Sequence, residues 1–169
     1  GAARVDGIEM DLSWAATDSL VFTGGFSWLD SQLTKDYVPD PDEPPAAFKG
    51  DSLPIAPDFK GNLTGRYTFQ VGEYASFAQL AYVYNGSSWS DLPRAEREAY
   101  GKQPAWSITD LSFGASRSDY TLTLYVSNLF NEIGRTWTYS QCTVGVCGVN
   151  PYYVPNQPRT IGLRFSQEF

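Results

Sequence analysis

The stretch "YTLTLYVSN", residues 120–128, decides the fold because apolar side chains occupy every second position in it. Successive side chains of a β-strand point to opposite faces of a sheet, so this period predicts a strand with one apolar and one polar face. Working outward along the chain, the same period recurs in further runs at residues 7–15, 20–33, 59–69, 76–85, 107–115 and 159–169. The sequence therefore predicts an all-β chain of about seven antiparallel strands, with helices close to absent.

One of these runs departs from strict alternation. Phe77, Ala81 and Val83 interrupt the polar face of the run at residues 76–85. An extra residue in one strand of a pair moves the following side chains to the other face of the sheet. We therefore expect a β-bulge in this strand.

The connections between the runs alternate in length without exception. Short turns occupy residues 16–19, 70–73 and 116–119, and long polar loops occupy residues 34–52, 85–104 and 132–157. Tight turns at one end and long loops at the other are typical of an outer-membrane barrel, whereas a soluble sandwich has no reason to obey this parity. The apolar face of each strand is then expected to meet lipid.

The distribution of aromatic and charged residues favours the same arrangement. Aromatic residues flank the ends of the runs, where interfacial girdles belong, at Trp14, Trp28, Tyr67, Phe69, Tyr84 and Tyr120. The opposite faces carry the charges expected of a wet, plugged lumen, at Glu9, Asp11, Lys60, Arg66, Asp110 and Arg164. A soluble barrel with its apolar face turned inward is the alternative that the pattern alone leaves open.

Composition excludes several classes of protein. A net charge of -7 without a basic stripe argues against nucleic acid and against docking on an anionic membrane surface. The chain contains no histidine, so the commonest general base and the commonest metal ligand are both missing. We expect no enzyme, no cofactor and no resident metal site.

The number of strands is also informative. Bacterial barrels have an even number of strands, and an open sheet in hydrocarbon would leave two unpaired edges. Seven strands therefore cannot close such a barrel. We expect either that the chain is the C-terminal piece of a larger barrel or that other strands lie in a separate chain.

The two cysteines, Cys142 and Cys147, stand five positions apart in a polar loop. A zinc site needs about four ligands, and the chain has no other Cys or His. A local disulfide between them is the better interpretation, and it implies an oxidising compartment.

Four segments together resemble the end of the barrel of TonB-dependent outer-membrane receptors. They are "LPIAPDFKGNLTGRYTF" (53–69), "ITDLSFGAS" (108–116), "YTLTLYVSNLFNE" (120–132) and "PRTIGLRFSQEF" (158–169). Two positions depart from the family pattern, since Asn131 replaces the acidic residue of its Asn-Leu-Phe-Asp segment and Gln167 replaces an apolar residue. The resemblance covers residues 5–169, which is nearly the whole chain.

The resemblance implies that residues 1–169 are the C-terminal part of a transmembrane barrel of about 22 strands in the outer membrane of a Gram-negative bacterium. It implies energy-coupled uptake of a scarce ligand, such as a ferric siderophore. The partners that it implies are outer-membrane lipid, the rest of the barrel and the plug, the TonB complex through the missing N-terminal part, and the barrel-assembly machinery. The alternatives left open are a soluble secreted all-β module that binds a carbohydrate or another ligand, and a small outer-membrane enzyme or adhesin.

Aromatic residues in the predicted extracellular loops are the candidate ligand-binding residues: Trp89, Trp106, Trp137, Tyr139, Tyr152 and Tyr153. Loop packing and an upper girdle explain the same residues at least as well. An acidic group in the first long loop, Asp36, Asp40, Asp42 and Glu43, has the hard oxygen ligands of a divalent cation site, although a solvated acidic loop is the simpler explanation.

The terminal run carries a second candidate site. Apolar residues at every second position before the last aromatic, Ile161, Leu163, Phe165 and Phe169, resemble the signal read by the barrel-assembly machinery. Recognition by β-augmentation of the exposed strand edge would fit this pattern. The alternative is that this is simply the last lipid-facing strand, and both descriptions can hold.

Overall fold

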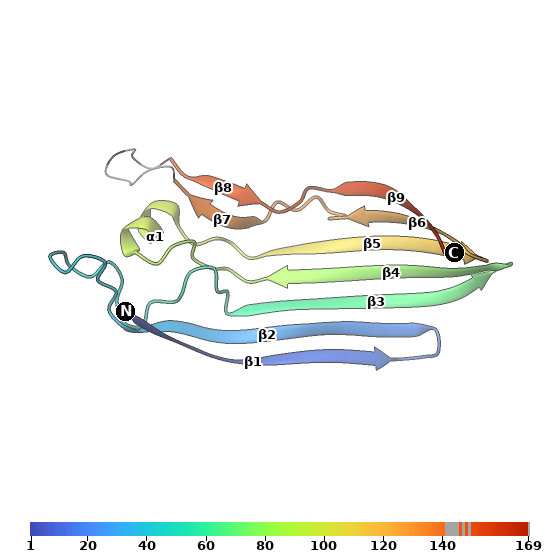
Figure 1. The fold of residues 1–169 in the computed structure, drawn as a ribbon, viewed down its shortest axis with the longest axis horizontal. Helices are drawn as coiled ribbons and strands as arrows, with labels where there is room; N and C mark the ends of the chain where they lie inside the picture. The colour runs from blue at the N-terminus through green and yellow to red at the C-terminus, as the bar shows by residue number, and fades with distance from the viewer. Residues whose placement is uncertain (141–145, 147, 149, 169) are drawn as a thin grey trace.

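The computed structural model describes residues 1–140, 146, 148 and 150–168 and contains one large antiparallel sheet. In spatial order its strands are β1 (Ala2–Ala15), β2 (Leu20–Lys35), β3 (Phe59–Val71), β4 (Tyr74–Asn85), β5 (Trp106–Arg117), β6 (Tyr120–Ser127) and β9 (Thr160–Gln167). A separate hairpin of β7 (Arg135–Tyr139) and β8 (Tyr152–Pro155) and one short helix, α1 (Arg94–Tyr100), lie in the long connections (Figure 1). All seven predicted strands are therefore confirmed, and helices are nearly absent as expected.

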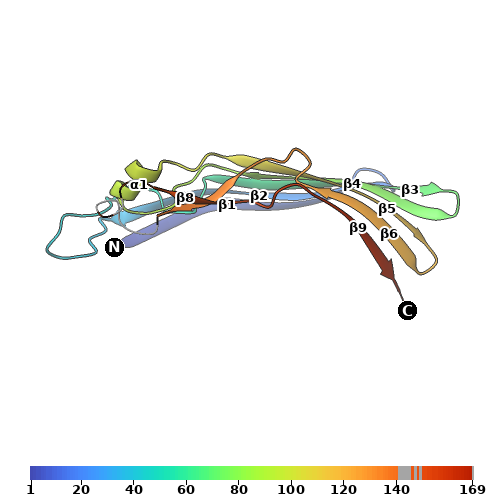
Figure 2. The same ribbon diagram turned by 90° about the horizontal axis from the view of Figure 1, so that it is seen from above.

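The sheet is open, with β1 at one edge and β9 at the other. Seen from above, the ribbon bends rather than lying flat (Figure 2). Neighbours in the sheet up to β6 are also neighbours in sequence, which is the meander expected of an up-and-down barrel wall. The described residues thus form a section of barrel wall that does not close on itself.

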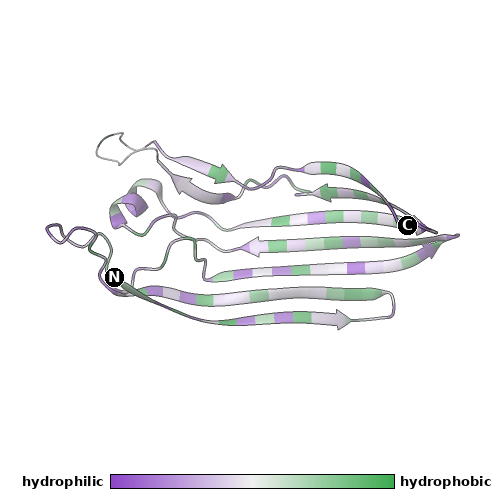
Figure 3. Cartoon of the chain, viewed as in Figure 1, coloured by the Kyte–Doolittle hydropathy of each residue, from purple (hydrophilic) through white to green (hydrophobic). Residues whose placement is uncertain are grey.

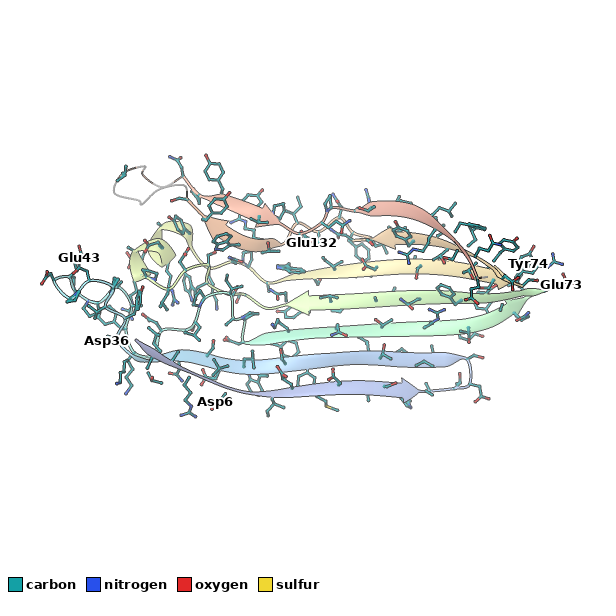
Figure 4. The ribbon with its side chains drawn as sticks, viewed as in Figure 1. Asp6, Asp36, Glu43, Glu73, Tyr74 and Glu132 are labelled. Atoms are coloured by element: carbon teal, nitrogen blue, oxygen red, sulfur yellow. The ribbon has the colours of Figure 1, made fainter. Side chains whose placement is uncertain are left out.

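The two ends of the sheet differ as the loop lengths predict. Glu73 and Tyr74 lie at the end with the short turns, and Asp36 and Glu43 lie at the opposite end (Figure 4). The β3–β4 and β5–β6 turns are two-residue turns that begin with a positive φ, 58° at Gly72 and 51° at Ser118. Two-residue hairpin turns of the primed types require such backbone angles. Short and long connections therefore segregate to opposite ends.

The strand register sorts the side chains into one apolar and one polar face. Leu122 pairs with Phe165 and Leu124 with Leu163, so that apolar side chains meet across each ladder. Alternating hydrophilic and hydrophobic bands run along the strands (Figure 3). The apolar face is bare, since Ile161 is 69% and Leu163 is 66% exposed, and the only buried hydrophobic residues among those described are Leu33 and Ala47. Nothing in the described part of the chain covers this face.

The β-bulge expected in the run at residues 76–85 is wrong. Pairing of β4 with β3 and with β5 runs without a shift, and the one shift in the large sheet lies at Ala2 and Ala3 of β1. Phe77 instead stays on the polar face, where it lies directly across from Gly114. A Cβ atom at position 114 would lie 2.1 Å from the Phe77 ring, so the glycine leaves the space that the ring occupies. The aromatic ring fits on the polar face because the residue opposite it on β5 is a glycine, and no β-bulge is needed.

Among the described residues, no helix is long and apolar enough to cross a membrane.

Candidate functional site at the loop end of the sheet

The three long connections, residues 36–58, 86–105 and 128–159, meet at one end of the sheet and are called here loop A, loop B and loop C. Loop A is folded back on itself through a bridge between Tyr37 and Ala47. Loop B contains α1, and loop C contains the β7–β8 hairpin. Hydrogen bonds and ion pairs join loop A to loop B and loop B to loop C, as the following contacts show.

Loop A is tied to α1 by a two-point ion pair. Arg94 donates from Nε and Nη2 to the two carboxylate oxygens of Asp51, at 3.1 and 2.9 Å. The Arg94 amide donates to the carbonyl of Ala46 at 2.9 Å, and its guanidinium lies 4.5 Å from the centre of the Phe48 ring. Two parallel hydrogen bonds between a guanidinium and a carboxylate are stronger than one, and they also fix the orientation of the two side chains relative to each other.

Arg97, one turn further along α1, is buried although it carries a charge, with 8% of its surface exposed. Its Nε donates to the carbonyl of Asp91 at 2.9 Å, and its Nη2 donates to the carbonyl of Ser52 in loop A. The guanidinium carbon lies 5.3 Å from the centre of the Trp89 ring. Buried charges persist only where such partners replace water, so Arg97 acts as an internal brace between the two loops.

The electrostatics of this junction follow from these contacts. The hydrogen bond from Arg94 holds the pKa of Asp51 below its ordinary value of 3.8. Burial lowers the pKa of Arg97 and raises the pKa of Asp91. The carboxylate form of Asp51 is therefore the form that holds the loops together.

Gln103 and Ser90 of loop B join the hairpin in loop C. With the Gln103 amide oriented to satisfy its neighbours, its nitrogen donates to the carbonyls of Arg135 and Thr136, at 3.0 and 3.2 Å. The backbone amide of Thr138 donates to the Ser90 hydroxyl at 3.0 Å, and Gln103, Ser90 and Thr138 are all buried. The hairpin is thus held on one face by a buried polar network.

Asn128 marks the exit from β6 into loop C and organises its base. Its backbone is left-handed, with φ of 52°, and only 2% of the residue is exposed. The amide nitrogen donates to the carbonyls of Glu132 and Gln157 at 2.9 and 3.0 Å, and the amide oxygen accepts from the Glu132 backbone at 2.8 Å. Asparagine is the non-glycine residue best suited to this combination of backbone angle and local hydrogen bonding.

Three of the six predicted ligand-binding residues come together on the hairpin. Trp137 stacks on Tyr139 with ring centres 5.2 Å apart, and Tyr139 lies 5.9 Å from Tyr152 on the paired strand. All three side chains are exposed, at 42%, 37% and 50% respectively. Because Thr138 is buried against loop B, these rings occupy the opposite, open face of the hairpin.

The other three predicted residues do not join this group. Tyr153 is on the Thr138 side of the hairpin, with the Arg135 guanidinium 4.9 Å from its ring centre. Trp89 packs against Arg97, and Trp106 lies against Gly134, where a Cβ atom would be 2.4 Å from the indole. Trp89 and Trp106 are thus each packed against another residue of the loop end, and neither touches the aromatic group on the hairpin.

Sequence reasoning missed the residues that lock the loops, namely Asp51, Arg94, Arg97 and Gln103. A signal for α1 was present in "PRAEREAYG", since Pro93 precedes a run of good helix formers and Gly101 ends it with φ of 71°. No local pattern indicates that Arg97 would be buried. That outcome depends on loop A, whose contact residue Ser52 is 45 positions away.

Two of the four acidic residues predicted in loop A, Asp36 and Asp40, accept hydrogen bonds from backbone amides of their own loop. Asp36 accepts from the Lys49 amide at 2.8 Å, and Asp40 accepts from the Asp42 amide at 3.0 Å. Within the part of the chain that the structure describes, no group of three or more His, Cys, Asp or Glu side chains is arranged to hold a metal ion.

The polar face of the sheet carries two arginines supported by aromatic rings. The Arg66 guanidinium lies 3.7 Å from the centre of the Phe77 ring and 3.4 Å from the Gln79 amide oxygen. Arg164 lies 5.8 Å from the Tyr125 ring centre. A concavity of about 310 Å³ separates these groups on the same face. This face therefore offers charged groups to whatever lies inside the barrel.

The described part of the last strand carries its apolar residues on one face. Ile161, Leu163 and Phe165 lie on the apolar face of β9, opposite Val126, Leu124 and Leu122. Phe169, Cys142 and Cys147 lie outside the described residues, so the structure does not bear on the terminal aromatic or the disulfide.

Comparison with known proteins agrees with this geometry. Residues 1–129 match the family model for TonB dependent receptor-like β-barrels. The chain is 25% identical over its whole length to the metal-pseudopaline receptor CntO of Pseudomonas aeruginosa, of which it covers 21%.

Two solved structures have the same fold. The ferric yersiniabactin uptake receptor FyuA of Yersinia pestis superposes with a TM-score of 0.80 at 19% identity, covering 99% of this chain and 24% of that one. The siderophore receptor PiuA of Acinetobacter baumannii superposes with a TM-score of 0.72 at 20% identity, covering 96% of this chain and 21% of that one. The chain thus spans between a fifth and a quarter of the length of these proteins.

Both lines of observation favour an outer-membrane barrel over a soluble, secreted all-β module. Its apolar face would have to be covered, but in the described residues that face is exposed from β1 to β9. The family match covers most of the chain and places it in the outer membrane of a Gram-negative bacterium. In barrels of this kind the apolar face of the strands meets lipid. The chain belongs to the TonB-dependent receptor-like β-barrel family.

Proposed function

We propose that residues 1–169 form the C-terminal part of the barrel of a TonB-dependent transporter that takes up a scarce ligand by energy-coupled transport. We infer that the ligand is a metal chelate of the siderophore type, with the metal brought as cargo. CntO is named a metal-pseudopaline receptor and FyuA a ferric yersiniabactin uptake receptor, which supports this ligand class. The plug and the coupling segment lie outside this sequence.

The observation that carries the proposal is the aromatic face of the hairpin, made by Trp137, Tyr139 and Tyr152. Stacked rings present a rigid apolar surface at little cost in side-chain entropy, and the phenol groups can still form hydrogen bonds. Loop B holds the other side of the hairpin through Gln103 and Ser90. A preorganised surface of this kind loses little entropy when a flat organic ligand binds.

The remaining predicted residues have secondary roles in this proposal. Tyr153 lies on the same hairpin, and Trp89 and Trp106 support the loops from beneath. A disulfide between Cys142 and Cys147 would restrict the tip of the hairpin and so keep the aromatic face in place.

The partners follow from the same assignment. The plug packs against the polar face, where Arg66 and Arg164 are available for ion pairs, and the TonB complex acts through the missing N-terminal part. The barrel-assembly machinery reads Ile161, Leu163, Phe165 and Phe169, and outer-membrane lipid surrounds the apolar face. The chain has no catalytic role and no nucleic-acid partner in this proposal.

The test expresses the complete receptor in a strain whose chromosomal gene for this receptor has been deleted. The strain is grown with the metal chelate as its sole source of the metal. Trp137→Ala and Tyr139→Ala should reduce ligand affinity by roughly tenfold or more, because each removes a large ring from a binding surface. The matched control is Phe130→Ala, which removes an exposed ring of loop C outside the hairpin. Unchanged affinity and growth in both hairpin variants would overturn the proposed site, and a receptor that imports no metal chelate would overturn the proposed function.

A further inference from the structure

The lipid-facing side of the sheet is hollowed across strands β1 to β4. A groove of about 340 Å³ crosses β1 to β4, with Met10, Phe26, Phe59, Leu63 and Tyr84 on its sides and Gly24 and Gly61 on its floor. Its size falls within the range of small-molecule sites. The lining is apolar, so the groove is suited to a hydrocarbon occupant.

Gly61 on the floor of the groove has no requirement for glycine from its own surroundings. A Cβ atom there would lie 3.5 to 3.6 Å from its nearest neighbours, which is ordinary van der Waals contact, and its φ is not in the left-handed region. Gly24 differs, since its Cβ would lie 2.5 Å from the Asn62 carbonyl oxygen, and the space at Gly65 is taken by the Phe22 ring at 3.0 Å. Of these three lipid-facing glycines, Gly61 is thus the one at which a Cβ atom would fit without displacing a neighbour.

Glycine inside a strand weakens the strand, and it often marks a place where a ligand approaches the backbone closely. The open space at Gly61 is enclosed on one side by aromatic rings. Phe59 stacks with Phe26 at 6.0 Å between ring centres and lies 5.9 Å from Tyr84. The aromatic rings and the absence of a side chain at Gly61 together form a narrow groove, called here the slot. The lipid-facing surface at Leu122, Leu124 and Ile161 serves as the reference and is called the flat wall.

The depth of the groove in the membrane follows from the strand register. Asp6 pairs with Asp30, Ile8 with Trp28, and Met10 with Phe26 as β1 descends along β2. The outward-facing side chains therefore change from carboxylates to apolar residues between the first and second of these pairs (Asp6 is labelled in Figure 4). Strands rise about 3.4 Å per residue, and those of barrels tilt by about 40°, so the groove begins roughly 5–10 Å below this boundary. It lies on the side of the long loops, in the extracellular half of the membrane.

We propose that this groove is a binding site for one acyl chain of an outer-leaflet membrane lipid. Lipid tails are as apolar as the groove, so the hydrophobic effect does not favour the site over the surrounding bilayer. Dispersion contacts do favour it, because a chain in a slot has protein atoms on several sides whereas a chain against a flat wall has them on one. The occupant is a lipid rather than a protein segment because this surface faces the hydrocarbon of the bilayer along β1 to β4.

The test uses the complete receptor, purified and reconstituted in vesicles that contain a trace of phospholipid with a photoreactive diazirine in its acyl chain. Adducts are mapped to peptides by mass spectrometry after illumination. Labelling at Met10, Leu63 and Tyr84 is expected to exceed labelling of the flat wall at Leu122, Leu124 and Ile161 several-fold.

Variants at the floor of the groove make the test specific. Gly61→Leu should lower labelling of the groove peptides to the level of the flat wall. Ala78→Leu, which adds the same side chain to the same face outside the groove, should leave groove labelling unchanged. Gly61→Ala should give an intermediate loss, and it keeps the test decisive if the leucine variant fails to assemble, because its Cβ meets only ordinary contacts.

Two results would overturn the proposal. One is even labelling of all lipid-facing peptides that the Gly61 variants do not change. The other is recovery of groove residues crosslinked in high yield to a protein, either a second copy of the receptor or another chain, since the slot would then be a protein interface.

Discussion

Asp51 of loop A and Arg94 of α1, 43 residues apart in sequence, form a two-point ion pair with both N–O distances at or below 3.1 Å. On the same helix, the buried guanidinium of Arg97 reaches the carbonyl of Ser52, the residue next to Asp51. Arg94 and Arg97 of α1 therefore join loop B to two consecutive residues of loop A. Removing either contact should change how fast the backbone amides of loop A exchange with solvent.

Arg97→Ala should open the junction between loops A and B. The carbonyls of Ser52 and Asp91 would lose their donor while remaining partly buried, at a cost of about 1–3 kcal/mol in local stability. Amide hydrogen exchange in residues 46–58 should then speed up roughly 10- to 100-fold in the complete receptor. Glu98→Ala, an exposed change on the same helix, is the control and should leave exchange unchanged. Equal protection in both variants would show that Arg97 does not brace the loops.

The contact between Asp51 and Arg94 should depend on pH in the acid range. A carboxyl group whose folded-state pKa is lowered contributes stability that is fully present above its ordinary pKa, here 3.8, and that is lost as the pH falls through the folded-state value. Loop A should therefore exchange faster, after correction for the intrinsic rate, as the pH falls below about 4. Burial raises the pKa of Asp91, so protonation of Asp91 favours the folded loops and opposes the effect of Asp51. The Asp51→Asn variant separates the two contributions. That variant should lose the Asp51 part of the pH dependence, and a wild-type profile in it would rule out this carboxyl group.

Asn128 should be among the most sensitive positions of loop C. Asn128→Gly keeps access to the left-handed backbone but removes three side-chain hydrogen bonds, at roughly 2–4 kcal/mol. Asn128→Ala should cost about 1 kcal/mol more, because alanine disfavours positive φ. Equilibrium unfolding of the receptor in urea with lipid vesicles measures both values. If the two variants were equally stable, the backbone angle would contribute nothing to the preference for asparagine.

Adjacent residues of β6 test which face of the sheet meets lipid. Leu124→Arg should destabilise the folded receptor by about 2–4 kcal/mol, because it places a charge in the hydrocarbon. Thr123→Arg, one position earlier on the polar face, should have a much smaller effect. Folding free energies in vesicles of defined thickness provide the measurement. The reverse order of the two costs would mean that the faces are assigned the wrong way round.

Removing Phe169 should lower the yield of receptor assembled in the outer membrane, because the proposed assembly signal would lose its terminal aromatic. The folded, heat-modifiable form on electrophoresis measures that yield in cells. Glu168→Ala, next to it in sequence, is the control. Normal assembly after deletion of Phe169 would refute the role of this residue as a signal.

The sequence by itself determined the large sheet. The alternation of apolar residues, for example Leu122, Leu124 and Val126, is a property of neighbouring positions in the sequence. A register slip of one residue would move every apolar side chain to the wrong face, so this alternation also specifies the strand register. The positions of the seven strands and the parity of the loops could therefore be predicted without a structure.

Tertiary structure alone decided the contacts between residues far apart in sequence. Phe77 fits on the polar face because Gly114 lies across from it, and Trp137 and Tyr139 meet Tyr152 because β7 pairs with β8. Arg97 is buried because loop A covers it. No local pattern in the sequence encodes these contacts. Each depends on which residue of a distant strand or loop comes to lie next to the side chain in the folded protein. The strands follow from the chain's own period, whereas the candidate site follows from loop closure.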